Sequence, residues 1–218
     1  MFNKILSKAV SKDNMHPAIC NVYYDKDASK YIATNGRIML IENTSDTYDQ
    51  DKFLSPLTGL GVECSCTFPD WSVVVPEDGD SINERKFLIY TRTEKSKQQA
   101  NKIVQIGELH VNYDLLKIVL DFIGSDFILT NKDPRKPLKF RSLDGLRIAL
   151  LMPIYSLDLE KFVKNQELLD ACQPCAKQAK VKYVYIAYDE SGAVRGIFSK
   201  ITDARKEATG KVQEYPIL

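Results

Sequence analysis

Apolar residues recur every three or four positions in two segments of the chain, residues 3–13 and 112–123. This period predicts an amphipathic helix in each segment. Asn3 and Asn112 can cap the two helices, because an asparagine side chain accepts hydrogen bonds from the free N–H groups of a first turn. Gly124 is expected to end the second helix.

Short runs of β-branched and aromatic residues, separated by turn residues, predict strands after each helix. Asn35-Gly36 and Asp144-Gly145 are hairpin signals, because both residues of each pair tolerate a positive φ. The predicted strands cover residues 19–24, 30–34, 37–42, 87–91, 103–110, 127–131, 137–142 and 146–152.

The order of helix, strand, strand, strand therefore occurs twice, beginning near residues 3 and 112. This order predicts an α+β fold made of a duplicated α-β-β-β unit, with antiparallel sheets and two helices. Chance recurrence of two hairpins after two helices is the alternative. The pattern changes after Ile154, so we expect one domain at 1–155 and a small C-terminal α+β module at 156–218. The elements expected in that module are a helix over 157–169, strands over 183–188 and 194–198, and a short helix over 202–208.

Composition is that of an ordinary globular protein, which excludes wholesale disorder, collagen and coiled coil. The chain has 218 residues, 44% of them hydrophobic, and its 30 basic and 29 acidic residues give a net charge of +1. This balance removes the simplest argument for nucleic-acid binding but leaves room for a local basic face.

The lysines near the start are not followed by an apolar run of the length a secretory signal needs, and no stretch approaches the ~20 apolar residues of a membrane span. We therefore expect a cytoplasmic protein with no membrane partner and with reduced thiols. Cys64 and Cys66 could join Cys172 and Cys175 in a four-thiolate zinc site, and the second pair could be a redox motif. Unremarkable thiols are the favoured interpretation, so no metal and no cofactor are expected.

Five segments of the first 155 residues carry short motifs. They are Met-His-Pro-Ala-Ile at 15–19, Tyr-Ile-Ala-Thr-Asn-Gly-Arg-Ile-Met-Leu at 31–40, Phe-Pro-Asp-Trp-Ser-Val-Val-Val-Pro at 68–76, Tyr-Asp-Leu-Leu-Lys-Ile-Val-Leu at 113–120, and a stretch from Pro137 that closes on Met-Pro-Ile at 152–154. Together these motifs resemble one divergent domain of the bacterial β sliding clamp, the processivity subunit of the replicative polymerase. The resemblance departs from the family in three ways. The Phe-Pro-Asp-Trp segment lies nearer the Asn-Gly hairpin, the chain has room for one clamp domain instead of three, and residues 156–218 have no counterpart.

The resemblance implies a protein that works by topology and electrostatics and not as an enzyme. In the family, six domains close a ring whose helices meet the phosphates of duplex DNA, and partner proteins insert short peptides into an apolar pocket. Met152, Pro153 and Ile154 match the segment beside that pocket, which makes them the expected partner-binding residues.

Two groups of basic residues are the candidate DNA contacts. Lys4, Lys8 and Lys12 are spaced i, i+4 and i+8, which would place them in one stripe on the first predicted helix. A solvated helix face is the alternative, and the second predicted helix offers only Lys117 between two aspartates. The second group lies in 84–102, where an exposed loop is the alternative; its candidate DNA-binding residues are Arg85, Lys86, Arg92, Lys95 and Lys97.

Signals for an enzyme are poor. His16 and His110 stand in contexts typical of structural histidines, and no hydrolase, phosphate-loop or metalloprotease motif is present. The first hypothesis is a non-enzymatic sliding-clamp relative that encircles or cradles duplex DNA as an oligomer and tethers a polymerase or other replication protein. The second is a protein–protein interaction module that keeps the clamp fold without forming a ring. An enzyme with an unrecognised site is a weaker third.

Overall fold

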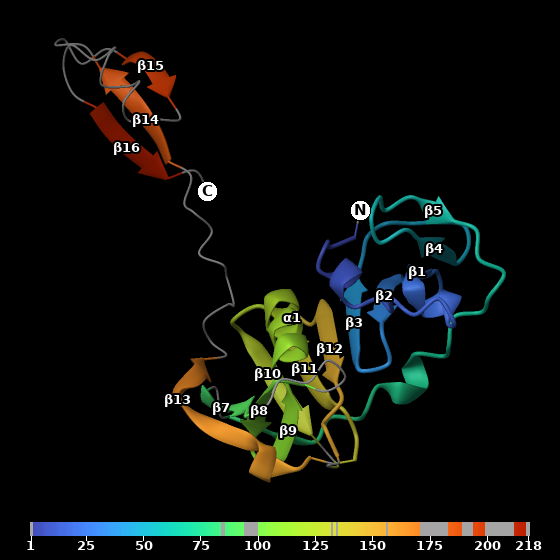
Figure 1. Ribbon diagram of the computed structural model, residues 1–218. Helices are drawn as coiled ribbons and strands as arrows, with labels where there is room; N and C mark the ends of the chain where they lie inside the picture. Colours follow the sequence, from blue (N-terminus) through green and yellow to red (C-terminus); the bar gives the residue numbers. More distant parts are fainter. Residues whose placement is uncertain are drawn as a thin grey trace. The chain divides into compact units, whose positions relative to one another are not determined.

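The computed structural model describes residues 2–83, 86–93, 100–131, 133, 135–155 and 157–170, together with three strands nearer the C-terminus. The chain divides into two compact units, Met1–Cys175 and Ala176–Leu218. The sequence pattern placed the boundary earlier, after residue 155, and the difference arises because β13 (Phe162–Asp170) pairs with a strand of the first unit. Figure 1 labels the elements of both units.

A sheet of nine antiparallel strands forms most of the first unit, in the order β5-β4-β1-β2-β3-β12-β11-β10-β6. Two three-stranded meanders, β1-β2-β3 and β10-β11-β12, meet where β3 pairs with β12, with Ile41 opposite Ile148. The strands predicted for both meanders are confirmed, with ends that shift by up to three residues. The nine strands are β1 (Val22–Asp25), β2 (Lys30–Thr34), β3 (Ile38–Asn43), β4 (Lys52–Leu54), β5 (Gly61–Val62), β6 (Asp80–Ser81), β10 (Phe127–Asn131), β11 (Leu138–Ser142) and β12 (Arg147–Leu151).

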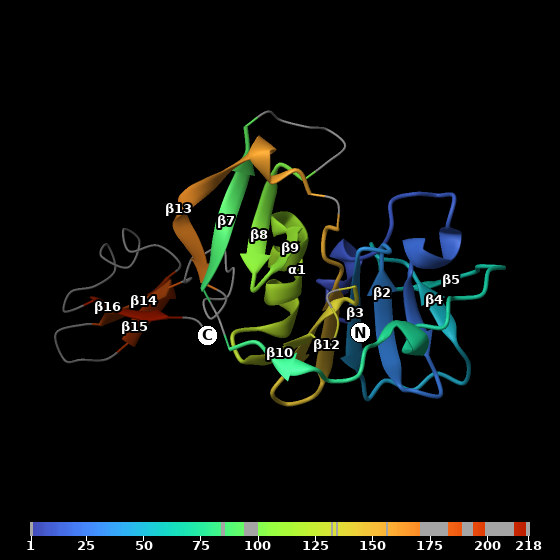
Figure 2. The ribbon, with the colours of Figure 1, turned by 90° about the horizontal axis from the view of Figure 1, so that it is seen from below.

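A second sheet has the order β13-β7-β8-β9 and is also antiparallel (Figure 2). The single strand predicted over 103–110 is in fact the hairpin β8–β9, which turns at Gly107 with φ of 58°. The strands are β7 (Lys86–Arg92), β8 (Lys102–Ile106), β9 (Leu109–Asn112) and β13 (Phe162–Asp170).

The helix predicted over 157–169 is wrong. Only a short 3-10 turn, η4 (Leu159–Lys161), precedes β13, which pairs along the edge of β7. Phe162 and Leu169 are buried by this pairing. Tertiary pairing at an open sheet edge therefore outweighs the local helical pattern.

One α-helix, α1 (Tyr113–Ile123), is found in the described part of the chain, as predicted for 112–123. Asn112 caps it by accepting a hydrogen bond from the Leu115 N–H at 3.0 Å, and Gly124 ends it with φ of 89°. The helix contacts β3, β11 and β12 of the large sheet and β8 and β9 of the small one, and Figures 1 and 2 show it between the two sheets. Its buried residues are Leu116, Val119, Leu120, Phe122 and Ile123.

The helix predicted over 3–13 is wrong. The segment forms a 3-10 turn, η1 (Leu6–Lys8), and a second such turn, η2 (Pro17–Cys20), follows it. The Ser11 N–H donates to the Ile19 carbonyl at 2.8 Å, which diverts the chain from a helical course. Leu6 and Ala9 are fully buried, so the apolar period reflects core packing without an α-helix. The expected repeat therefore has a helix only before its second meander.

The opposite face of the large sheet is covered by the segment that contains Phe68 and Trp71. Phe68 packs with Ile32 and Ile41 and stacks on Tyr23 with ring centroids 4.4 Å apart. The Trp71 indole N–H donates to Asp25 at 2.7 Å. These contacts hold residues 68–75 against the large sheet. The sheet is therefore covered on one face by α1 and on the other by this segment.

The second unit contains a three-stranded antiparallel sheet with the order β15-β14-β16. The strands are β14 (Tyr183–Tyr188), β15 (Val194–Phe198) and β16 (Val212–Pro216). The first two were predicted with these bounds, whereas β16 was not. The predicted helix over 202–208, Cys172 and Cys175 lie outside the described residues.

Replacing Phe122 by alanine should destabilise the first unit by about 3–5 kcal/mol, because the ring is fully buried between the sheets. Urea unfolding followed by the fluorescence of Trp71, the single tryptophan, measures this unit directly. Leu143→Ala is the control; that side chain is 67% exposed, so its effect should stay within about 0.5 kcal/mol. Equal effects of the two substitutions would contradict the assigned packing.

Candidate partner-binding groove

The segment Met152–Pro153–Ile154 connects the two sheets of the first unit. The Met152 N–H donates to the Arg37 carbonyl at 2.9 Å, which extends the pairing of β12 with β3. The Ile154 N–H donates to the His110 carbonyl at 2.7 Å, at the outer edge of β9. Pro153, which has no N–H to satisfy, is buried between these two bonds.

A pocket of about 380 Å³ lies beside this segment. The three expected partner-binding residues form one wall, and Asn112 and Leu115 contribute from the start of α1. Apolar side chains dominate the lining; they are Ala100, Leu115, Met152, Pro153, Ile154, Leu157 and Phe162.

A smaller pocket of about 140 Å³ adjoins it and is almost entirely apolar. Arg37 and Met152 line both pockets and so form the divide between them. Met152 also lines a third, open hollow with Val73 and Pro137. We call the three hollows around this residue the Met152 groove. The smaller pocket is lined by Thr34, Gly36, Arg37, Ile38, Met39, Val74, Pro137, Leu150 and Met152.

The turn between β2 and β3 positions Arg37 at the divide. Gly36 has φ of 81°, a conformation that glycine adopts without strain. The Asn35 carboxamide oxygen accepts hydrogen bonds from the N–H groups of Arg37 and Ile38 at 2.9 and 3.1 Å. The Asn-Gly hairpin signal in the sequence thus predicted the turn, but not that the next residue would line a pocket.

The larger pocket carries three cationic side chains and one carboxylate. Lys161 donates to Asp158 at 2.8 Å and holds the pKa of that carboxyl below its ordinary value, with a smaller contribution from Arg92. The Arg92 guanidinium lies 5.0 Å over the Phe162 ring. Arg37 is exposed and forms no ion pair with any carboxylate of the described residues.

The candidate DNA-binding residues are not brought into one stripe. Lys4, Lys8 and Lys12 are exposed, but no helix carries them together, and Lys8 lies 3.7 Å from Asp121 of α1. Lys86 is exposed on β7, whereas Arg92 lines the groove. Arg85, Lys95 and Lys97 lie outside the described residues.

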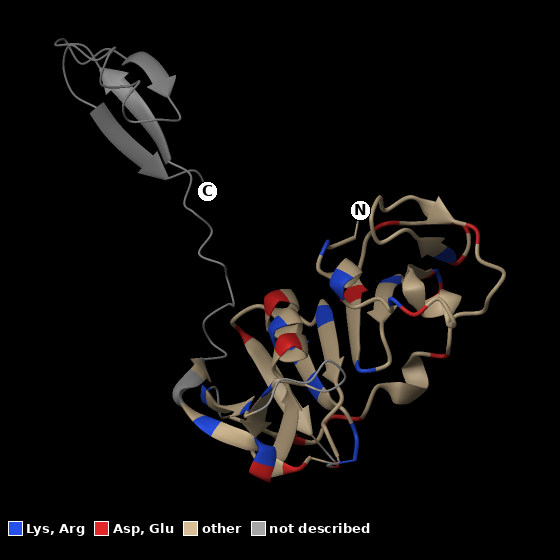
Figure 3. Ribbon diagram, viewed as in Figure 1, with Lys and Arg blue, Asp and Glu red and all other residues tan. Residues whose placement is uncertain are grey.

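The solvent side of α1 has no excess of positive charge. Asp114 and Asp121 flank Lys117, so acidic and basic residues alternate along the helix (Figure 3). This agrees with the sequence expectation that the second helix would not attract phosphate.

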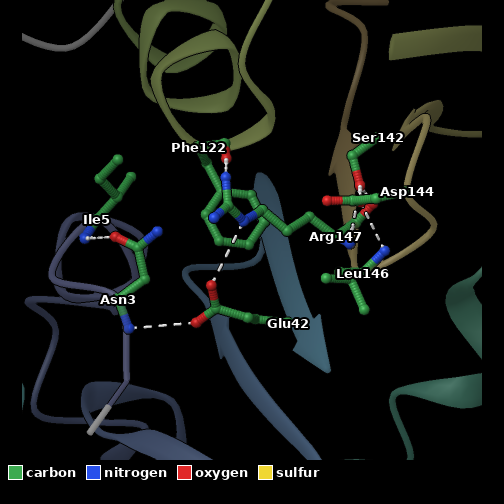
Figure 4. A network of polar contacts seen from close by, with 8 residues as sticks. All are labelled: Asn3, Ile5, Glu42, Phe122, Ser142, Asp144, Leu146 and Arg147. Atoms are coloured by element: carbon green, nitrogen blue, oxygen red, sulfur yellow. Dashed lines mark hydrogen bonds and ion pairs between the residues drawn. The ribbon is translucent and has the colours of Figure 1, made fainter. Parts of the chain in front are cut away.

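A polar network centred on Arg147 fastens the N-terminal segment to α1 (Figure 4). The Arg147 guanidinium donates to the Phe122 carbonyl at 3.1 Å and pairs with Glu42 at 3.4 Å. Glu42 in turn accepts from the Asn3 N–H at 3.2 Å. No sequence signal singled out this network, because its members come from distant parts of the chain.

The predicted Asp144-Gly145 turn precedes Arg147 and is confirmed, with φ of 71° at Gly145. The Asp144 carboxylate accepts hydrogen bonds from the Ser142 hydroxyl and the Leu146 N–H, and the first of these lowers the pKa of Asp144 most. The Arg147 N–H donates to the Ser142 hydroxyl at 3.0 Å, so this turn also positions the backbone of Arg147.

Within the described ranges, no three His, Cys, Asp or Glu side chains gather as metal ligands would. The same part of the chain holds no helix with the length and apolarity needed to cross a membrane.

Comparison with known proteins identifies the fold. No protein-family model matches the sequence, and no curated protein matches it significantly. Among solved structures, the sliding clamp (DNA polymerase III subunit β) of Bartonella birtlesii, bound to griselimycin, matches with a TM-score of 0.50 at 12% identity. The β subunit from Thermotoga maritima matches at 0.50 and 14%, and a Pseudomonas aeruginosa sliding clamp at 0.51 and 12%.

These matches cover 70%, 71% and 70% of this chain and 64%, 63% and 64% of the respective clamps. The chain therefore spans less than two thirds of the length of the clamps that it matches. It has a divergent sliding-clamp fold of antiparallel sheets, as the sequence motifs predicted.

His110 offers a test of the junction between the Met152 segment and β9. Burial lowers the pKa of His110 below its ordinary value, so the unfolded chain binds a proton at this imidazole more readily than the folded chain does. As the pH falls through the ordinary imidazole pKa of about 6.5, the free energy of unfolding should therefore decrease. His110→Gln should reduce this slope. Urea unfolding at several pH values measures it, and equal slopes for the two proteins would contradict the burial of the imidazole.

Proposed function

With the sliding-clamp fold as the premise, we propose that this chain is a non-enzymatic scaffold that tethers a partner protein through the Met152 groove. One observation carries the proposal. The segment Met152–Ile154, which resembles the segment beside the partner pocket of clamps, lines a real pocket in this structure. The groove combines apolar hollows with a few charged groups, as peptide and ligand sites do.

The partner is proposed to present a short extended peptide. The 140 Å³ pocket is about the size of the cavity that holds one benzene molecule, so it suits a single apolar side chain. The larger pocket beside it can take the neighbouring residues. A replication protein is the partner class suggested by the clamps with which this chain shares its fold.

Duplex DNA is a second candidate partner, supported by the exposed Lys4, Lys8 and Lys12, of which Lys8 lies beside α1. Against it stand the missing first helix and the two aspartates on α1. The interaction module without a DNA-encircling ring is therefore the better supported of the two main hypotheses.

Selection of short peptides from a displayed random library tests the tether. The wild-type chain should enrich peptides with apolar anchors, and Met152→Lys should weaken their binding by about tenfold or more, because it places a charge between the two pockets. Met15→Lys is the matched control, since Met15 is 81% exposed and lies outside the groove. Thermal unfolding confirms that both variants fold. Failure of the wild-type chain to enrich any peptide would refute the tether.

Binding to nicked circular and linear duplex DNA at two salt concentrations tests the second candidate. A backbone contact should weaken as salt rises, and replacing Lys4, Lys8 and Lys12 together by glutamate should abolish it. Light scattering shows at the same time whether the chain assembles. A monomer whose retention of DNA is independent of salt and of the three lysines would exclude this candidate.

A further inference from the structure

We propose that β13 keeps this chain from pairing, strand to strand, with a second copy of itself. It does so by covering β7, which among the described strands would otherwise be the one long open sheet edge of the first unit. The inference concerns residues 162–170, to which neither the family resemblance nor the proposed tether gives a role. It does not rest on the tether.

Without β13, the strand β7 would end the small sheet. It is seven residues long, and β8 is its only other neighbour in that sheet. Its Phe87 and Ile89 side chains are buried in the core of the first unit, which holds the strand in place. An edge strand of this kind presents a row of unpaired N–H and C=O groups, to which a strand of another chain can pair.

β13 covers this edge from one end to the other (Figure 2). Phe162 lies opposite Arg92, the last residue of β7, and Asp170 lies opposite Lys86, the first. The position that a strand of a second copy would take is therefore occupied by this chain's own strand.

Side chains at both ends and within β13 hold it in this position. Phe162 and Leu169 are buried, and Leu169 belongs to the same core cluster as Phe87. Between them, the Thr91 hydroxyl donates to the Asn165 carboxamide oxygen at 3.0 Å. Loss of the two apolar anchors would therefore free the strand, because the core would no longer favour its attachment.

The outer edge of β13 is itself poorly suited to pairing. Lys164 lies opposite Tyr90 and Leu168 opposite Leu88, so four positions along β13 correspond to two along β7. Such a bulge interrupts the regular ladder, and the exposed Lys164 adds a charge beside it. β13 therefore ends the sheet without offering a continuous edge of its own.

The three other sheet edges of the first unit offer less to a second copy. β5 and β6, at the two ends of the large sheet, have two residues each. At the outer edge of β9, the His110 carbonyl already accepts a hydrogen bond from the Ile154 N–H. Among the described strands, the cover over β7 therefore decides whether the chain can pair through a sheet edge.

The test removes both anchors of β13 in the full chain, with Phe162→Asp and Leu169→Asp together. A carboxylate is costly to bury, so β13 should leave the edge. The wild-type chain should be a monomer in light scattering, whereas the mass of the variant should rise with protein concentration to that of a dimer or more. At the lowest concentration, the β7 amides of the variant should exchange with deuterium about tenfold faster, while those of α1 stay protected.

Val163→Asp is the matched control, because it places the same charge on β13 at a side chain that is 59% exposed. It should stay monomeric with β7 protected. Leu169→Ser alone is a milder second variant, which should show the same changes to a smaller degree. Unfolding in urea, followed by the fluorescence of Trp71, shows whether each variant is folded.

A synthetic peptide with the sequence of residues 161–170 distinguishes strand pairing from general stickiness. Added in excess, it should return the double variant to the monomer by covering β7 again, whereas a scrambled peptide should not. Association that the peptide does not reverse would overturn the inference, because it would arise elsewhere on the surface.

Three other outcomes would also overturn it: a wild-type chain that already self-associates, a folded variant that exposes β7 and stays monomeric, and a double variant whose β7 amides remain protected. Failure of the library selection described above bears on the tether alone and leaves this inference in place.

Discussion

Burial of the apolar face of α1 between two sheets is the constraint on which the first unit depends. An isolated helix of 11 residues would be marginal in water, so its stability must come from packing. Its buried face includes Leu116, Leu120 and Phe122. Because Asn112 is both the last residue of β9 and the cap of α1, packing the helix on β12 also brings β9 toward the end of β12.

The groove is a direct consequence of this arrangement. The chain that leaves β12 can reach β9, where Ile154 donates to the His110 carbonyl, and Leu115 in the first turn of α1 becomes part of the pocket wall. The same packing places the Arg147 guanidinium against the C-terminal end of α1, at the Phe122 carbonyl. The candidate site and the core therefore depend on the same packing of α1.

Local sequence patterns predicted an element correctly where the packing of the folded chain favours the same conformation. α1 was predictable because its apolar period, Asn112 cap and Gly124 stop all favour one helix. The helix expected over 157–169 failed because an open edge of β7 was available to pair with Phe162–Asp170, which no local pattern could show. The helix expected over 3–13 failed because Ser11 bonds to Ile19 across a turn. Met152–Ile154 was found through a family resemblance, whereas Arg37 lies more than a hundred residues away along the chain and joins it only through the pairing of β3 with β12.

Near-zero net charge proves compatible with a charged site. Acidic and basic residues alternate on α1, while Arg37, Arg92 and Lys161 gather in the groove. The chain thus keeps the sheets of a sliding clamp, and its described basic residues are not arranged in one helical stripe. The most direct measurement of this account is a methyl NMR titration of the methionine-labelled protein with an apolar peptide selected on the chain. The account predicts that the Met152 and Met39 signals shift while that of the exposed Met15 does not. A peptide that binds and shifts only Met15, or leaves Met152 unchanged, would contradict it.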